Sequence, residues 1–340
     1  MTITSIPELE EVLSRPSPAD VEAMRSLDGD LLVLGVGGKM GPSLARRAQR
    51  AIEQAGVNRR VIGVSRFSSA GLAGELEAAG IQTISADLME DRDLAALPDI
   101  ENVVFMAARK FGTTGNEHLT WALNTYLPGR VAERFHRSRI VAFSSGNVYP
   151  LVPVVEGGAT EQTPTAPVGE YAASVLGRER MFQHFSARYG TLGVLLRLNY
   201  AIDLRYGVLL DTGTKVFERR PVNLAMGSVN VIWQGDANSV TLRSFALASA
   251  PPRVLNLTGP ELLSVRWIAL EFGRRFGVEP VFEGVESPAA LLNNAAECQK
   301  LFGYPGVAVS QLIDWTAEWI RIGGSTLNKP THFDVRDGKF

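Results

Sequence analysis

The sequence predicts an α/β protein with a doubly wound parallel sheet of about seven strands and a smaller C-terminal α/β lobe. From residue 31 onward, apolar runs of strand length alternate with segments in which apolar residues recur at helical spacing. Such alternation is typical of parallel strands joined by crossover helices. With 340 residues, 45% of them hydrophobic, the chain can bury a sizeable core as one large or two smaller domains.

The pattern places the elements of the first 200 residues in order. Strands are expected at 31–35, 60–65, 81–85, 102–108, 139–144 and 192–198. Helices between them are expected at 42–55, 70–79, 117–136 and 170–189. Residues 150–169 are rich in Pro, Gly and Thr, so we expect a loop over the carboxyl edge of the sheet there.

The turn after the first expected strand is rich in glycine. Gly35 permits a tight turn, Gly38 lets the backbone approach a pyrophosphate, and Gly41 lets the next helix pack closely on the strand. The helix N-terminus offers unpaired N–H groups and a partial positive charge to phosphates. A strand, a glycine loop and a helix in this order predict a Rossmann-type dinucleotide site, which also includes Lys39 and Met40. The alternative is a glycine turn that binds nothing.

This site suggests how the chain is divided. The expected units are an N-terminal helical extension at 1–29, a dinucleotide-binding domain at 30–200, a substrate lobe at 201–322 and a polar tail at 323–340. A strand near 253–257 is expected to return to the sheet, and the lobe carries helices near 264–276 and 310–322. We expect the tail either to be partly disordered or to cross to a partner chain.

The ends of the second and third strands bear on the choice of cofactor. Ser65 and Arg66 stand where an acidic side chain would favour NAD. A hydroxyl and a guanidinium suit a 2′-phosphate, because arginine donates charge-assisted, fork-shaped hydrogen bonds, and Lys39 can add positive charge. We therefore expect NADP as the cofactor, with NAD as the alternative. The other interpretation of Arg66 is a solvated surface charge that binds no phosphate. Asp87 and Leu88 either meet the adenine, or Asp87 caps a helix at 88–96.

A hydroxyl and a phenol are candidates for acid/base chemistry. Ser145 closes the fifth strand and Tyr171 opens the helix 170–189. Such an arrangement can bring both groups to one substrate carbonyl above the nicotinamide. Because the ordinary pKa of a phenol is about 10, Tyr171 needs help to act as a base near neutral pH.

The order and spacing of these motifs resemble the extended short-chain dehydrogenases/reductases of the NAD-dependent epimerase/dehydratase family, over roughly residues 30–322. Beyond the glycine loop, the matching positions are Ala107-Ala108, Asn124, Ser144-Ser145 with Val148-Tyr149, Tyr171, Arg197 with Asn199, Asp236 and Asn256 to Glu261. The resemblance implies that Ser145 and Tyr171 are catalytic and that Ala107, Ala108 and Asn124 bind the cofactor. Asn124 has an alternative role, in which it bridges buried backbone groups through a water. The resemblance also implies a sugar, sugar acid or nucleotide-sugar as substrate, and a homodimer.

One position departs from the family pattern. The family motif is Y-x-x-x-K, in which the lysine binds the nicotinamide ribose and lowers the pKa of the tyrosine, whereas this chain has Val175. Arg178 lies on the same helical face as Tyr171, two turns further on. Arg109 and Lys110 follow the fourth strand and are the other candidates for the missing charge. Each of the three also has an alternative role on the surface.

Other polar groups are candidate substrate ligands, namely Arg109, Asn147, Asn199, Thr113, Thr114, Arg205 and Lys215. The formal net charge of −2 argues against nucleic acid or anionic lipid as partners. A single cysteine, Cys298, excludes an internal disulfide, and the four histidines lack metal-ligand spacing. Without a signal sequence or an apolar run of about 18 residues, the chain is expected to be cytoplasmic.

Two classes of function follow. The first is an NAD(P)-dependent oxidoreductase, epimerase or dehydratase that transfers hydride, with Tyr171 as the general acid/base. The second is a regulatory or sensor protein that binds the dinucleotide without turnover, as Val175 suggests. A third possibility keeps catalysis but gives the acid/base role to Glu156, Glu161 or Glu170.

Overall fold

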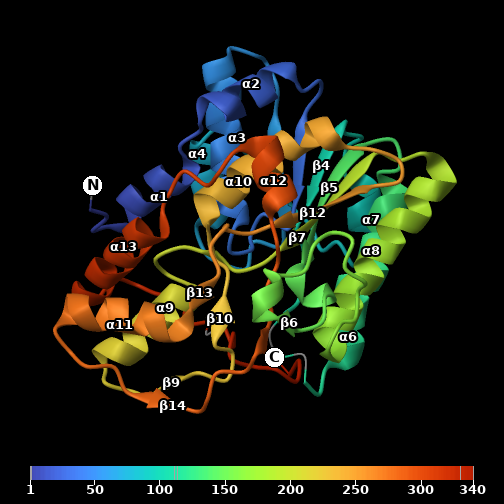
Figure 1. Ribbon diagram of the computed structural model, residues 1–340. Helices are drawn as coiled ribbons and strands as arrows, with labels where there is room; N and C mark the ends of the chain where they lie inside the picture. The colour runs from blue at the N-terminus through green and yellow to red at the C-terminus, as the bar shows by residue number, and fades with distance from the viewer. Residues whose placement is uncertain (1, 111, 113, 330, 340) are drawn as a thin grey trace.

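A seven-stranded sheet forms the centre of the computed structural model, which describes every residue except 1, 111, 113, 330 and 340 (Figure 1). Its strands are β1 (Leu31–Leu34), β2 (Val61–Ser65), β3 (Gln82–Ser85), β4 (Asn102–Phe105), β5 (Arg139–Ser145), β7 (Gly193–Leu198) and β12 (Arg253–Leu257). Their order across the sheet is β12-β7-β5-β4-β1-β2-β3, with every neighbouring pair parallel. The predicted doubly wound fold is therefore confirmed. The order reverses beside β1, which places the ligand-binding switch point between β1 and β4.

Helices cover both faces of the sheet, with α7 and α8 on the side opposite α3 and α10 (Figure 1). Leu31 and Val33 pack in the core on the face of α3, whereas Leu32 and Leu34 pack on the other face. The period of two in a parallel strand explains why all four residues are apolar. The helices are α3 (Gly41–Ala55), α4 (Leu72–Ala78), α5 (Asp91–Ala96), α7 (Leu127–Arg134), α8 (Gly169–Tyr189) and α10 (Gln234–Arg243).

The segment expected as one helix at 117–136 contains a wider turn. It consists of α6 (Glu117–Trp121), a π-helical turn η1 (Ala122–Tyr126) and α7. Pro128 has no N–H group, so it cannot donate the helical hydrogen bond to the carbonyl of Asn124. A π turn at this place leaves the Asn124 carbonyl available to another donor.

The second lobe packs three helices together, α9 (Val208–Phe217), α11 (Val265–Phe276) and α13 (Val309–Arg321). Short strand pairs join segments within this lobe and join the lobe to segments at the edge of the central sheet. They are β8 (Ala201–Ile202) with β11 (Ile232–Trp233), β9 (Val222–Asn223) with β14 (Phe282–Glu283), β10 (Ser228–Val229) with β13 (Leu263–Ser264), and β6 (Val152–Pro153) with β15 (Ala289–Ala290). A short helix, α12 (Ala296–Phe302), packs on β12.

The N-terminal extension forms α1 (Ile6–Ser14) and α2 (Pro18–Ser26), each with a serine capping box and a proline in its first turn. Both helices lie on α3. Asp20 of α2 is fully buried, accepts two hydrogen bonds from Arg47 of α3, and accepts another from Ser239 of α10. The extension is thus joined to the rest of the molecule by a buried ion pair.

The C-terminal segment returns to its own chain in the parts that the structure describes, 323–329 and 331–339. Thr331 and Phe333 are buried, and the Thr331 backbone N–H donates to the Asp211 carboxylate. Arg336 donates to the carbonyl oxygens of Ala225 and Ala289. Figure 1 shows this segment ending near β6. No helix in the described part of the chain has the length and apolar character needed to cross a membrane.

Further local predictions differ from the structure, among them the loop expected at 150–169, which contains β6. The fourth strand ends at Phe105 rather than at residue 108. The helix expected at 88–96 begins at Asp91 with Glu90 as its N-cap, so the prediction that Asp87 caps it is wrong. Asp87 instead accepts a hydrogen bond from the Met89 backbone N–H at 3.0 Å, which closes a local turn before the helix starts.

Candidate active site

The glycine loop has the shape that a dinucleotide phosphate requires. Gly35 has φ = 91°, and a Cβ atom there would lie 2.7 Å from the backbone nitrogen of Ala107. A Cβ atom on Gly41 would overlap the carbonyl oxygen of Val36. The N-cap of α3, Met40, makes no side-chain capping bond, so its side chain does not occupy the N–H groups of the first turn, in which Pro42 has none. These features fit a pyrophosphate at the N-terminus of α3.

The next positions lie at the carboxyl ends of β2 and β3. The Ser65 hydroxyl accepts from the Phe67 backbone at 3.4 Å, close to the loop at Gly37. The Arg66 side chain is 72% exposed, and its guanidinium lies 3.7 Å from the Asp87 carboxylate. Leu88 is buried in the core. Ser65, Arg66 and Asp87 therefore gather at one rim of the loop.

Lys39 does not join this group, contrary to the prediction that its charge adds to that of Arg66. Its Nζ donates to the carbonyl of Ala201 at 2.7 Å and lies 3.8 Å from the ring centroid of Tyr206. The side chain thus reaches across to Ala201 and Tyr206 of the second lobe. Burial lowers the pKa of Lys39 to about 7, and the positive charges of Lys110 and Arg205 act in the same direction.

Ser145 and Tyr171 meet at the carboxyl edge of the sheet, as the sequence predicts. Both side chains are buried, and the Ser145 hydroxyl is hydrogen-bonded to Tyr171. Ser145 Oγ also donates to Asn147 Oδ1 at 2.9 Å and accepts from the Asn147 backbone N–H at 3.2 Å. Burial raises the pKa of Tyr171 above its ordinary value, while the charge of Arg178 and the hydrogen bond with Ser145 lower it. At neutral pH the phenol is therefore protonated.

Asn124 joins the loop after β4 to α8. Its Oδ1 accepts from the backbone N–H of Arg109 at 2.9 Å, and its Nδ2 donates to the Arg109 carbonyl at 2.8 Å and to Ser174 Oγ at 3.1 Å. The side chain is fully buried. These contacts join the loop and the helix directly, whereas the alternative prediction had Asn124 act through a water. Ala107 is half-buried and Ala108 exposed at the start of the same loop.

The three candidates for the missing lysine charge lie in different places. Val175 is buried in the apolar core. Arg178 is buried beside Asn124, whereas the Arg109 guanidinium turns to the carbonyl of Gly112 at 3.0 Å. The Lys110 ammonium lies 5.9 Å from the ring centroid of Tyr171, and burial lowers its pKa to about 8.

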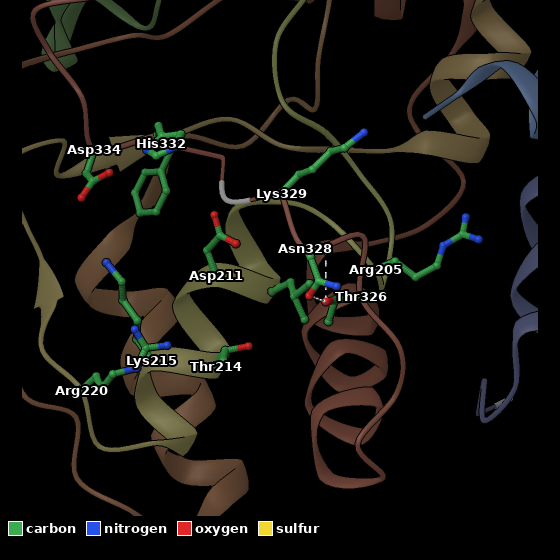
Figure 2. A pocket seen from close by; sticks show the side chains of 12 residues that line it. Arg205, Asp211, Thr214, Lys215, Arg220, Thr326, Asn328, Lys329, His332 and Asp334 are labelled. Atoms are coloured by element: carbon green, nitrogen blue, oxygen red, sulfur yellow. Dashed lines mark hydrogen bonds between the residues drawn. The ribbon is translucent and has the colours of Figure 1, made fainter. Parts of the chain in front are cut away.

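The predicted substrate ligands are only partly brought together. Asn147 is beside Ser145, but Asn199 is buried and donates to the Leu291 carbonyl at 3.4 Å. Thr113 lies outside the described residues. Arg205 and Lys215 line a hollow of about 500 Å³ between α9 and the C-terminal segment. In Figure 2, Asp211 of α9 and Lys329, His332 and Asp334 of the C-terminal segment border this hollow.

The alternative carboxylates have other partners. Glu161 accepts from the Asn256 backbone N–H at 2.8 Å, and Glu170 accepts from the Trp121 indole at 2.5 Å. Glu156 is exposed. None of these bonds directs a carboxylate at Ser145 or Tyr171, which favours Tyr171 as the acid/base. In the described residues, no three His, Cys, Asp or Glu side chains gather as metal ligands do.

Sequence reasoning missed Tyr206 and Asp211, which are electrostatically coupled to the site. Burial raises the pKa of Tyr206, and Tyr171 and Asp211 raise it further. Burial also raises the pKa of Asp211. Neither residue belongs to a recognisable motif, because both lie in a lobe whose path does not follow from strand and helix periodicity.

The comparisons with known proteins agree with this architecture. The NAD dependent epimerase/dehydratase family model matches residues 31–202, half of the chain, so the chain belongs to that family. Similar structures include Pal from Bacillus thuringiensis (17% identity, TM-score 0.71, covering 86% of this chain and 99% of that one). UDP-glucuronic acid 4-epimerase from Bacillus cereus, in complex with UDP-glucuronic acid and NAD, has 18% identity and a TM-score of 0.71 over 86% and 99% of the two chains.

A third similar structure is DesIV, a dTDP-glucose 4,6-dehydratase from Streptomyces venezuelae with NAD and TYD bound. It has 17% identity and a TM-score of 0.72, covering 86% of this chain and 97% of that one. No curated protein sequence matches this chain. Identities this low establish the shared fold, while the choice of substrate depends on this chain's own residues.

Proposed function

We propose that this chain is an NADP-dependent oxidoreductase, epimerase or dehydratase that acts on a carbohydrate-type substrate, with NAD as the alternative cofactor. The observation that carries the proposal is the hydrogen-bonded pair of Ser145 and Tyr171, placed beside a glycine loop that fits a pyrophosphate. Family membership supports it. The similar structures that bind NAD with nucleotide-sugars support the carbohydrate class.

Tyr171 and Ser145 have different roles at a substrate carbinol or carbonyl. A bound nicotinamide would supply the hydride acceptor or donor. The protonated phenol of Tyr171 donates its proton to a carbonyl oxygen, and Ser145 donates a hydrogen bond that polarises the same oxygen. Because burial raises the pKa of Tyr171, the residue is protonated and suited to donation at neutral pH. The reverse direction requires the phenolate and therefore a nearby positive charge.

Turnover tests the proposal. The purified protein is mixed with NADP⁺ or NAD⁺ and a panel of sugars, sugar acids and nucleotide-sugars. Absorbance of the reduced cofactor is followed, and products are identified because a redox-neutral epimerase shows no net absorbance change. Tyr171→Phe is expected to abolish turnover and leave cofactor binding intact. Tyr304→Phe, on a tyrosine that is 76% exposed, is the matched control and should retain full activity.

The second candidate function is a dinucleotide-binding regulatory or sensor protein. Val175, which is buried where the family has a lysine, favours it. Tight cofactor binding without any product across the panel would support this function over the enzyme.

We also propose a homodimer through α6 and α8. Leu119 and Tyr126 expose 41% and 59% of their surface on this side, and Tyr189 of α8 exposes 39%. Light scattering of the parent protein and of Tyr126→Asp tests it. A parent protein of monomer mass would contradict it.

A further inference from the structure

Arg178 carries a positive charge into the interior of the protein beneath Tyr171. Its side chain is only 2% exposed. Tyr171 and Arg178 are seven residues apart on α8 and therefore lie on one face of the helix. Side chains in a helix lean toward its N-terminus, so the guanidinium of Arg178 is directed toward the turn that carries Tyr171.

The hydrogen bonds of Arg178 show how far its guanidinium reaches. Nη2 donates to Asn124 Oδ1 at 3.0 Å, and Nη1 donates to the Phe143 carbonyl at 2.8 Å. The same Asn124 side chain donates to Ser174 Oγ, one turn closer to Tyr171. Phe143 lies two residues before Ser145 on β5. The guanidinium is thus held between the strand that carries Ser145 and the helix that carries Tyr171.

The third bond explains why the site can hold an arginine. Nε of Arg178 lies 3.4 Å from the main-chain carbonyl of Asn124, the group that Pro128 cannot satisfy within its own helix. The π turn at 122–126 and Arg178 therefore complement each other. An apolar residue at 178 would take this donor away from the buried carbonyl.

The charge of Arg178 is not cancelled by a direct ion pair. Its hydrogen-bond acceptors are two carbonyl oxygens and one amide oxygen, and no ion pair includes it among the described residues. The adjacent carboxylate, Glu179, is engaged by Arg197 through two hydrogen bonds. A buried cation without an ion-pair partner costs stability, so its retention beside an acid/base residue indicates a functional role.

Other groups face Tyr171 from the neighbouring elements. Lys110 lies over its ring, Ser145 bonds its hydroxyl, and Tyr206 approaches from the substrate lobe. The pKa of Lys110 is lowered to about 8, whereas that of Arg178 is lowered only to about 10. Arg178 therefore stays charged across the neutral range, in which Lys110 begins to lose its proton.

We propose that Arg178 is the positioning residue whose fixed positive charge stabilises the Tyr171 phenolate, in place of the lysine that Val175 replaces. This inference rests on the proposed function only in taking Tyr171 as the acid/base. Arg178 need not touch substrate or cofactor, because its charge acts through the low-dielectric interior between β5 and α8.

A titration of Tyr171 alone tests the proposal. The phenol at position 171 is replaced by 3,5-difluorotyrosine, whose greater acidity brings the titration closer to neutral pH, and its ¹⁹F resonance is followed against pH. Arg178→Gln removes the charge but keeps an amide that can donate to Asn124, although it cannot donate to all three acceptors of the guanidinium. We expect its midpoint to rise by about one pH unit or more, a tenfold or greater fall in the ionisation constant. Arg180→Gln, an exposed arginine on the same helix, should leave the midpoint unchanged.

A gain-of-charge variant completes the experiment. Val175→Lys combined with Arg178→Gln is expected to return the midpoint toward that of the parent. If Arg178→Gln does not fold by circular dichroism, Val175→Lys alone should lower the midpoint of the parent. An unchanged titration midpoint in folded Arg178→Gln would overturn the proposal. If only Val175→Lys folds, an unchanged midpoint in that variant would overturn it. Because no substrate is present, failure of the catalytic proposal would appear only in the turnover assay.

Discussion

The carboxylate of Glu179 and the guanidinium of Arg197 form a buried, two-pronged ion pair, with Nε to Oε1 at 2.9 Å and Nη2 to Oε2 at 2.7 Å. Glu179 comes from α8 and Arg197 from β7. Ser144 donates to the same carboxylate at 2.6 Å, and Arg197 donates to the Tyr149 hydroxyl at 2.7 Å. The pair therefore fixes the helix of Tyr171 to the sheet directly below the candidate site.

Removing one partner of this pair should strongly destabilise the protein. Glu179→Ala leaves Arg197 buried without its counter-charge, so we expect the free energy of unfolding to fall by about 3–5 kcal/mol. Urea unfolding measures the change. Glu297→Ala, which removes a partly exposed partner of Arg253, should cost less than about 1 kcal/mol. A loss for Glu179→Ala as small as that of the control would contradict the prediction.

A substitution at Gly38 should change cofactor binding without changing the fold. A Cβ atom there has only the Gly35 carbonyl oxygen nearby, at 3.3 Å, and Gly38 is exposed at the loop. We expect Gly38→Ala to keep the fold but to weaken dinucleotide binding about tenfold or more, because a methyl group occupies the phosphate approach. Calorimetric titration measures the Kd. Gly74→Ala in α4, with open space around it, should leave the Kd unchanged and raise stability by about 0.5–1 kcal/mol.

Arg66 should decide between the two cofactors. If it binds a 2′-phosphate, Arg66→Ala will weaken NADP binding by about tenfold and change NAD binding little, since charged hydrogen bonds contribute about 1.5–3 kcal/mol. The ratio of the two Kd values is the measurement. Equal losses of affinity for NADP and NAD would show that Arg66 does not bind the 2′-phosphate. Arg59→Ala serves as a control, because the Arg59 side chain donates to the carbonyl oxygens of Met24 and Arg25 in α2.

Lys39 should make cofactor binding depend on pH. Its pKa is about 7 in the free protein, so at pH 8 the amine is mostly neutral. Phosphates bound at the loop would raise that pKa, so binding takes up a proton and the affinity falls as pH rises above 7. The fall is at most about tenfold per pH unit.

Calorimetry at pH 8 in two buffers of different ionisation enthalpy detects this proton. Lys39→Met should remove both the proton uptake and the pH dependence, whereas Lys300→Met on α12 should not. Identical binding enthalpies in the two buffers with the parent protein would rule out the coupling.

The central sheet and the glycine loop could be predicted because their signals are local. Apolar runs mark β1, β2, β4, β5 and β7, and the spacing of Gly35, Gly38 and Gly41 marks the loop. The helix α10 was missed because it buries polar residues: Gln234 and Asn238 both donate to Ser43 of α3. Hydrophobic periodicity does not detect a helix of this kind.

The interior of the site could be predicted only in part, because it depends on contacts between distant segments. The sequence placed Arg178 on the right helical face, but its burial depends on the carbonyl that Pro128 leaves unsatisfied. The direction of Lys39 depends on the carbonyl of Ala201, which lies 162 residues further along the chain. No spacing rule relates such groups.

The buried carboxylate of Asp20 has a kinetic consequence. It joins Arg47 of α3 and Ser239 of α10, and the latter lies 219 residues away in sequence. Contacts of such separation close slowly, because the loop entropy must be lost before they form. The extension therefore completes its attachment late in folding, after α10 has packed on α3. Refolding followed by protease resistance of residues 1–29 should show a phase slower than the formation of the central sheet.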